Sequence, residues 1–164
     1  GGGLNSTAVD LLVGDDAQNR QYRSILSFNT SGLPDTAVIT SAKLKIRQRY
    51  IVGTNPITTH GFMVVSIQNP RFGASNGLEL ADFNAAPGLY WGGSLGKVPT
   101  GNLYNATLLP AAFPFINPLG LTQLRLAFTL DDNNDSGTDL ISFFSGDTIT
   151  TTSRPYLEII YHLP

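Results

Sequence analysis

The sequence predicts an all-β protein: an antiparallel two-sheet β-sandwich of jelly-roll type, with about eight strands and one or two short helical turns. Three observations predict it. Apolar and polar residues alternate over short runs, as in strands that bury one face. Clusters of Gly, Pro, Asn and Asp separate these runs, and prolines interrupt the few stretches that could be helical. Two packed sheets can bury many strands that each have one apolar face. The chain length is typical of one domain, so we expect a single domain over residues 1–164.

The clearest strand is expected at 42–50, where basic side chains take one face and apolar side chains take the other. Four of the ten basic residues fall on that face, namely Lys43, Lys45, Arg47 and Arg49. The other strands are expected at 9–13, 22–28, 62–67, 103–108, 123–130, 140–144 and 156–161.

Helices are expected to be short. The stretches 81–86 and 111–117 each have room for about one turn, because prolines follow or interrupt them. The pair Gly92-Gly93 is interpreted as a turn signal, which places the single tryptophan, Trp91, in a loop.

The composition excludes several functions. Charged residues make up 13% of the chain, against about 25% in an average protein, and the net charge is -2. No basic surface for a nucleic acid is therefore expected. No apolar run is long enough to insert into a membrane. The absence of cysteine excludes thiolate catalysis and cysteine-ligated zinc, and it leaves the cellular compartment undecided.

Both ends of the chain resemble one known family. The stretches YRSILSFNTSGLP at 22–34 and AVITSAKLKI at 37–46 are similar to the opening core of the DNRLRE-type β-sandwich domains. The stretches FFSGD at 143–147 and RPYLEIIY at 154–161 are similar to the closing strands of that family. The resemblance therefore spans the whole chain, and it is a signature of core and turn residues, which specifies a fold more than a function.

The resemblance implies a location and a role. DNRLRE-type domains are accessory modules of large secreted bacterial and archaeal proteins, and a subset that accompanies alginate lyases binds polysaccharide. We therefore expect an extracellular or cell-surface protein. Family members usually begin with a further strand, whereas this chain opens with Gly1 to Thr7. Either the chain is truncated or assembly supplies the missing edge strand, because an unpaired edge accepts a strand from another chain.

The acidic segment 131–139, DDNNDSGTD, is a candidate calcium site. Oxygen-bearing side chains recur along it, and the candidate ligands are Asp131, Asn133, Asp135 and Asp139. The EF-hand pattern does not fit, because Ser136 and Ser142 stand where that pattern has Gly and Glu. The alternative is a polar hairpin turn without a metal. Asp15 and Asp16 would add carboxylates only if the two loops converge.

A candidate carbohydrate surface lies at Tyr90 and Trp91, because sugar rings pack their C–H faces on aromatic side chains. The basic residues Arg47 and Arg49 would add contacts to an acidic polysaccharide. The alternatives are a tryptophan packed over the end of the sandwich and a solvated basic face that prevents unwanted stacking of sheets.

No catalytic motif is present, and Glu79 and Asp82 form only an isolated pair, so we do not expect an enzyme. Two functions remain. The first is a secreted non-catalytic module for cell adhesion or polysaccharide binding. The second is a structural subunit of an extracellular filament or surface layer, assembled from copies of itself by strand pairing.

Overall fold

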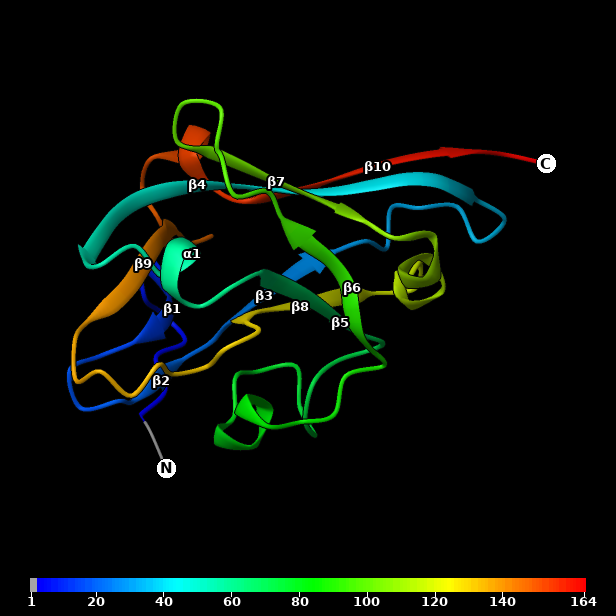
Figure 1. Ribbon diagram of the computed structural model, residues 1–164. Coiled ribbons are helices and arrows are strands. Elements are labelled where there is room, and N and C mark those ends of the chain that lie inside the picture. The colour runs from blue at the N-terminus through cyan, green and yellow to red at the C-terminus, as the bar shows by residue number, and fades with distance from the viewer. Residues whose placement is uncertain (1–2) are drawn as a thin grey trace.

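The computed structural model describes residues 3–164, so Gly1 and Gly2 of the expected domain lie outside the described residues. The chain is mostly antiparallel β-structure with a few short helices, which confirms the all-β prediction (Figure 1). The strands are β1 Asp10–Asp15, β2 Gln21–Tyr22, β3 Ser24–Asn29, β4 Val38–Gly53, β5 Met63–Gln68, β6 Leu89–Leu95, β7 Leu103–Leu108, β8 Leu121–Phe128, β9 Asp139–Phe144 and β10 Tyr156–His162. The helices are α1 Pro56–Thr59 and the 3-10 helices η1 Leu80–Phe83, η2 Pro110–Phe115 and η3 Thr151–Ser153.

The strands form one hydrogen-bonded path that nearly closes on itself. Their order is β2-β1-β9-β4-β7-β6-β5-β8-β3, and β10 pairs with β4 beside this path. The two ends of the path approach each other, because β1 contacts β3 and β8. The Ser24 hydroxyl of β3 also donates to the Leu12 carbonyl of β1 (2.9 Å). The arrangement resembles a nearly closed barrel, and the apolar core fills its interior.

Strand β4 joins the two halves of this path. Its first part pairs with β10 on one edge and with β7 on the other, and its last part pairs with β9. A register shift between Gln48 and Tyr50 marks the change of partner. The inward side chains Ala42, Leu44 and Ile46 are fully buried, as the alternating pattern predicts.

Strand β6 was not expected, because its glycines were interpreted as a turn. The structure gives those glycines another role. A Cβ atom at Gly93 would lie 2.7 Å from the Thr107 carbonyl oxygen of the neighbouring β7, so glycine permits close strand packing here. Trp91 consequently lies in a strand and not in a loop.

A long excursion between β5 and β6, coloured green in Figure 1, lies below these strands in that view and bonds to β8 through Gln123 and Arg125. It contains η1. The two short helical turns expected at 81–86 and 111–117 are present as η1 and, after β7, as η2. Helices α1 and η3 were not expected. Among residues 3–164, no helix is both long enough and apolar enough to cross a membrane.

Candidate functional site

An exposed aromatic pair lies at one side of β6. The Trp91 side chain is 39% exposed and Phe62, just before β5, is 49% exposed. Their rings meet edge to face with centroids 6.0 Å apart. The Lys97 ammonium lies 4.8 Å from the centre of the Phe62 ring. We call Phe62, Trp91 and Lys97 the aromatic surface.

A β-bulge presents this surface. Between the pairs Val65 with Gly93 and Ile67 with Leu89, β6 contains two more residues than β5. The additional residues fall around Tyr90 and Trp91, and bulges re-aim side chains in this way. Tyr90 is also half exposed. Phe62 was expected only as a strand residue, and its exposure could not be predicted from the alternating pattern.

The structure does not bring the predicted arginines to the aromatic surface. Arg47 pairs with Leu103 at the beginning of β7, whereas Gly92 bonds to Leu109 just beyond the end of that strand. Six residues of β-strand separate these positions, which corresponds to about 20 Å.

The basic row of β4 is partly neutralised. Arg49 forms an ion pair with Asp10, which also accepts a hydrogen bond from the Tyr50 hydroxyl (2.8 Å). Lys45 forms an ion pair with Glu158 of β10 (2.8 Å). The hydrogen bond between the two side chains raises the pKa of Lys45 and lowers the pKa of Glu158.

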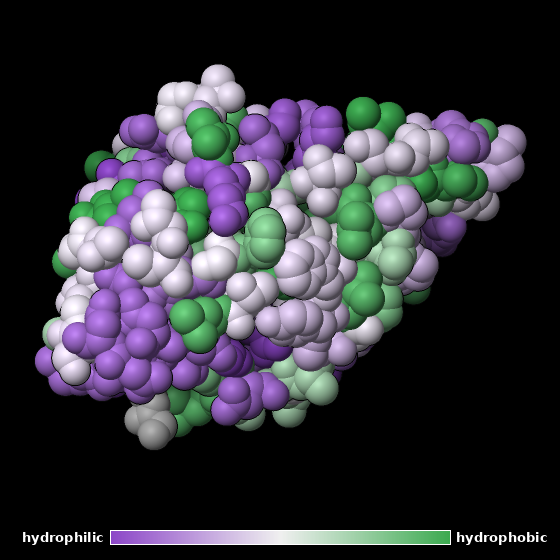
Figure 2. Space-filling view, in the orientation of Figure 1, coloured by the Kyte–Doolittle hydropathy of each residue, from purple (hydrophilic) through white to green (hydrophobic). Residues whose placement is uncertain are grey.

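The candidate calcium ligands separate into two groups. Asp131 forms an ion pair with Arg23 (2.6 Å). The Asn133 amide instead donates to both Asp135 and Asp139 (3.0 Å each), so these three residues lie together. The rest of the loop forms hydrogen-bonded turns. Figure 2 shows that strongly hydrophilic residues gather at the lower left of the molecule, where Figure 1 places this loop and β2.

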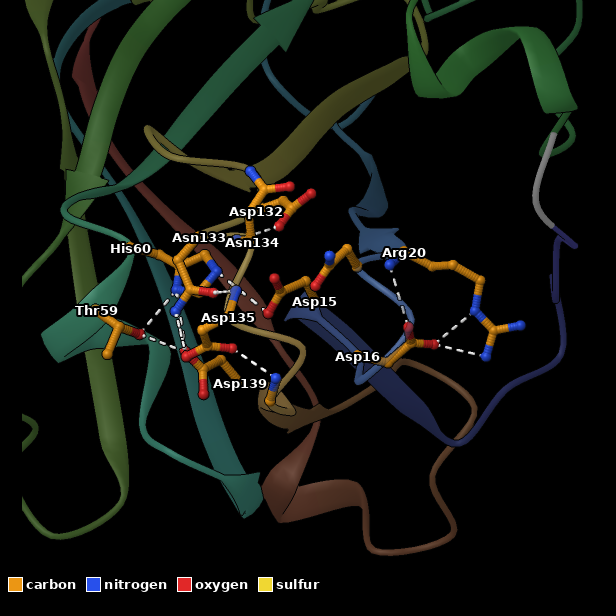
Figure 3. Close-up of polar contacts among 12 residues, drawn as sticks. Asp15, Asp16, Arg20, Thr59, His60, Asp132, Asn133, Asn134, Asp135 and Asp139 are labelled. Carbon is orange, nitrogen blue, oxygen red and sulfur yellow. Dashed lines mark hydrogen bonds and ion pairs between the residues drawn. The ribbon is translucent and has the colours of Figure 1, made fainter.

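A buried polar cluster lies beneath this loop, formed by Asp15, His60 and Asp139 (Figure 3). One possible ligand atom from each residue lies within 4.8 Å of the others. The register of β1 and β9 makes Asp15 and Asp139 direct partners across the two strands. Gly14 permits this approach, since it has a φ of 127° and a Cβ there would lie 1.9 Å from the Asp139 carbonyl oxygen.

The loop between β4 and β5 supplies His60. Helix α1 begins where the Asn55 side chain accepts a hydrogen bond from the Ile57 N–H (3.1 Å), and it ends at His60. The His60 carbonyl accepts the Leu130 N–H (3.1 Å), which fixes this loop to the residues after β8. The imidazole also packs against the Phe128 ring, with centroids 5.7 Å apart.

Hydrogen bonds define the orientation of the imidazole. The Thr59 hydroxyl donates to Asp139 Oδ2 (2.9 Å) and lies 2.8 Å from His60 Nδ1. Because a hydroxyl has one proton, its oxygen accepts the Nδ1–H of His60. In the neutral ring the lone pair is then on Nε2, which lies 3.3 Å from Asp15 Oδ1.

The cluster contains polar atoms without hydrogen-bond partners. Asp15 and His60 are fully buried and Asp139 is 1% exposed. Both carboxylate oxygens of Asp15, His60 Nε2 and Asp139 Oδ1 lack a partner. Burial is the main cause that raises the pKa of Asp15; the His60 ring and the Asn133 backbone N–H lie near enough to oppose this shift, although neither is in hydrogen-bonding geometry with the carboxylate. These groups are too deeply buried to reach a substrate molecule. Their unpaired oxygen and nitrogen atoms are of the kinds that bind a cation.

The next residue, Asp16, lies in a contrasting environment (Figure 3). Its carboxylate accepts the backbone N–H groups of Gln18 (3.0 Å) and Arg20 (3.1 Å), the Arg20 side chain and the Tyr22 hydroxyl (3.0 Å). The Arg20 side chain, followed by the backbone donors, lowers the pKa of Asp16 far below its usual value. This carboxylate stabilises the turn between β1 and β2.

A groove of about 510 Å³ lies beside β3. Residues 25–28 of that strand form one wall, and residues 76–78 of the excursion form another. Within the described residues β3 forms a backbone ladder only with β8; near its other edge β1 contacts it without ladder pairing.

A comparison with models of known protein families found no match, and a comparison with curated protein sequences found none either.

Two features of the site were not predicted. His60 lies between the strands predicted at 42–50 and 62–67, and nothing in the sequence indicates its burial. Asp15 is a candidate ligand in the sequence only if two loops converge. The structure brings Asp15 and Asp139 together. The signal that could have indicated this cluster is an acidic residue at one end of each strand, with Gly14 directly before Asp15 at a position that no turn explains.

Proposed function

We propose that this chain is a secreted, non-catalytic module that binds a polysaccharide, or mediates cell adhesion, through the aromatic surface. The observation that carries the proposal is the contact between two exposed aromatic rings, Trp91 on the bulge of β6 and Phe62 just before β5. Large aromatic side chains are usually packed inside, so a pair exposed together indicates a binding surface. In Figure 2 the face over β6 carries pale and hydrophobic residues, in contrast to the hydrophilic lower left.

The charge near this surface favours an acidic polysaccharide. Lys97 lies over the Phe62 ring and makes no ion pair among the described residues. A sugar ring packed on Trp91 would bring a uronic acid carboxylate within reach of the ammonium group. Hydroxyl groups of a neutral polysaccharide would gain less from the same lysine.

The proposed relationship is to the DNRLRE-type domains, with their two-sheet jelly-roll fold and extracellular location. The change of partner along β4 supports the two-sheet interpretation. It divides the strand path into a β2-β1-β9 side and a β7-β6-β5-β8-β3 side.

Affinity gel electrophoresis tests the proposal, with alginate and polygalacturonate as acidic ligands and xylan and mixed-linkage β-glucan as neutral ligands. Retardation by an acidic polymer should weaken about tenfold or more in Trp91→Ala and Phe62→Ala, because both remove stacking area. The matched control is Tyr161→Ala, which removes an exposed ring of β10 (40% exposed). Equal retardation of all variants, or no retardation by any of these polymers, would contradict the proposal.

A second candidate, a structural subunit that assembles by strand pairing, has its own supporting observation: the unpaired edge of β3 beside the groove. A strand from another copy would satisfy the backbone groups of that edge. Light scattering and electron microscopy should then show polymers. Ile25→Glu in the groove should abolish them, whereas Val98→Glu, at a residue 87% exposed, should not. Monomers at all concentrations would exclude this function.

A further inference from the structure

We propose that Asp15, His60 and Asp139 form a binding site for a divalent transition metal, with zinc as the preferred ion. The site is separate from the aromatic surface, and the proposal does not depend on the function proposed above. It differs from a calcium site in the acidic loop, because Asp131 is engaged by Arg23 and Asp135 is exposed.

The first argument is the set of unpaired atoms. Four buried atoms of the cluster lack a hydrogen-bond partner: Asp15 Oδ1, Asp15 Oδ2, His60 Nε2 and Asp139 Oδ1. Buried polar groups are nearly always satisfied in folded proteins, and each exception requires an explanation. Two fully buried carboxylates on directly paired strand positions also repel each other. A bound cation removes both costs.

The second argument is the orientation of His60. Its Nδ1–H donates to Thr59, which in turn donates to Asp139. Metal-binding histidines typically donate the proton of the nitrogen that does not bind the metal to such a neighbour. This arrangement directs the Nε2 lone pair toward Asp15.

The third argument is the distance of 3.3 Å between His60 Nε2 and Asp15 Oδ1. A charge-assisted hydrogen bond between these atoms would be shorter, about 2.7–2.9 Å. Two ligands that each lie about 2.0–2.1 Å from a tetrahedral zinc ion are about 3.3 Å apart. The distance therefore fits a shared metal better than a shared proton.

The fourth argument is charge. As metal ligands, one imidazole and two carboxylates bind in the neutral and the ionised form respectively, so together they carry a charge of about -2, which a divalent ion balances. One imidazole nitrogen with two carboxylate oxygens is a set that zinc accepts, whereas calcium prefers six to eight oxygen ligands. Three protein ligands leave one tetrahedral position for another donor.

The test uses the full chain after dialysis against a chelator. Zinc sulfate, calcium chloride and manganese chloride are titrated separately by calorimetry, and the retained metal is measured by mass spectrometry. We expect one zinc ion per chain, tighter binding of zinc than of calcium, and a rise of the thermal unfolding midpoint with zinc. The variants Asp15→Asn and His60→Gln should bind zinc at least about a hundredfold more weakly.

The matched control is His162→Gln, which removes the other histidine of the chain, exposed on β10, and should bind zinc normally. Because a variant of a buried residue can fail to fold, the wild-type chain is also loaded with cobalt(II). Its visible absorption should show tetrahedral coordination, and X-ray absorption of the zinc form should show one imidazole. Zinc uptake that only His162→Gln removes, tighter binding of calcium, or no uptake above one-tenth of an ion per chain would overturn the proposal.

Discussion

Two regions of this protein bury charged side chains, and they differ in how these side chains are compensated. Arg125 of β8 is 5% exposed, and its guanidinium donates to the carbonyl oxygens of Asp82 (2.8 Å), Phe83 (3.3 Å) and Ala85 (2.8 Å). It also lies over the Phe72 ring at 4.6 Å. The cluster of Asp15, His60 and Asp139 is buried as deeply, yet several of its atoms have no partner.

The two regions differ in whether the chain itself provides partners for the buried charged groups. The excursion between β5 and β6 presents its carbonyl groups to Arg125, so the chain itself supplies hydrogen-bond acceptors for this charge. Desolvation nevertheless lowers the pKa of Arg125, which records the cost of burying it. In the aspartate and histidine cluster the chain supplies donors to Asp139 Oδ2 and a partner for His60 Nδ1, but none to the two Asp15 oxygens, His60 Nε2 or Asp139 Oδ1. Their compensation has to come from a bound ion.

The largest expected effect comes from removing the satisfied charge. Arg125→Met would leave the Asp82 and Ala85 carbonyl groups buried without a donor, and we expect a loss of about 3–5 kcal/mol in the free energy of unfolding. Urea denaturation measures it. The control Arg71→Met, in the same excursion, removes two exposed bonds, to the Ala74 carbonyl (3.1 Å) and the Asn76 side chain (3.5 Å), and should cost far less. Equal losses would show that the carbonyl cradle is unimportant.

The next largest effect is the change in stability of Asp15→Asn, which should have opposite signs without and with zinc. In chelator, Asp15→Asn should stabilise the protein by about 1–4 kcal/mol, because it removes one of two buried carboxylates that face each other without a cation. In zinc the same variant should be less stable than the wild type, because it loses a ligand. Thermal unfolding in both buffers provides the measurement. The same sign in both buffers would remove the distinction between the two regions.

Asp16, next to Asp15, sharpens the comparison, because its carboxylate has all the donors that Asp15 lacks. Asp16→Ala should cost about 1–3 kcal/mol, through the loss of charge-assisted bonds from the Gln18 and Arg20 N–H groups. Unlike Asp15→Asn, this loss should be similar in chelator and in zinc. A change of sign between the two buffers would indicate that Asp16 also contacts the ion.

The smallest effect is expected at the surface pair of Lys45 and Glu158. The lysine lowers the pKa of Glu158 from its ordinary value of 4.5. The pair therefore contributes stability above that pH and loses it as the pH falls through the lower, folded pKa. Lys45→Met should reduce stability slightly at pH 7 and leave it unchanged at pH 2. A loss as large as that of Arg125→Met would contradict the view that exposed pairs contribute little.

The alternating pattern predicted much of the fold, because a strand with one buried face can be recognised from its own residues alone. Leu44 and Ile46 are in the core, as expected. Strand β6 was missed because Gly92 and Gly93 resemble a turn, and only the neighbouring strand shows why glycine is needed there.

The buried cluster could not be predicted in this way. Asp15 and Asp139 become partners through the register of β1 and β9, which periodicity within one segment does not specify. Similarly, Trp91 and Phe62 are separated in sequence and meet through the pairing of β5 with β6. The residue types were visible in the sequence, but their neighbours depend on long-range pairing.

The continuity of β4 has a mechanical consequence. One uninterrupted backbone holds β10 at one end and β9 at the other. All of β10 lies along the first part of β4 (Figure 1). A force on His162 along the strand direction would therefore load the hydrogen bonds between the two strands in shear, so that many of them resist together. Such a geometry resists a force along the strands better than a force that separates the bonds one after another.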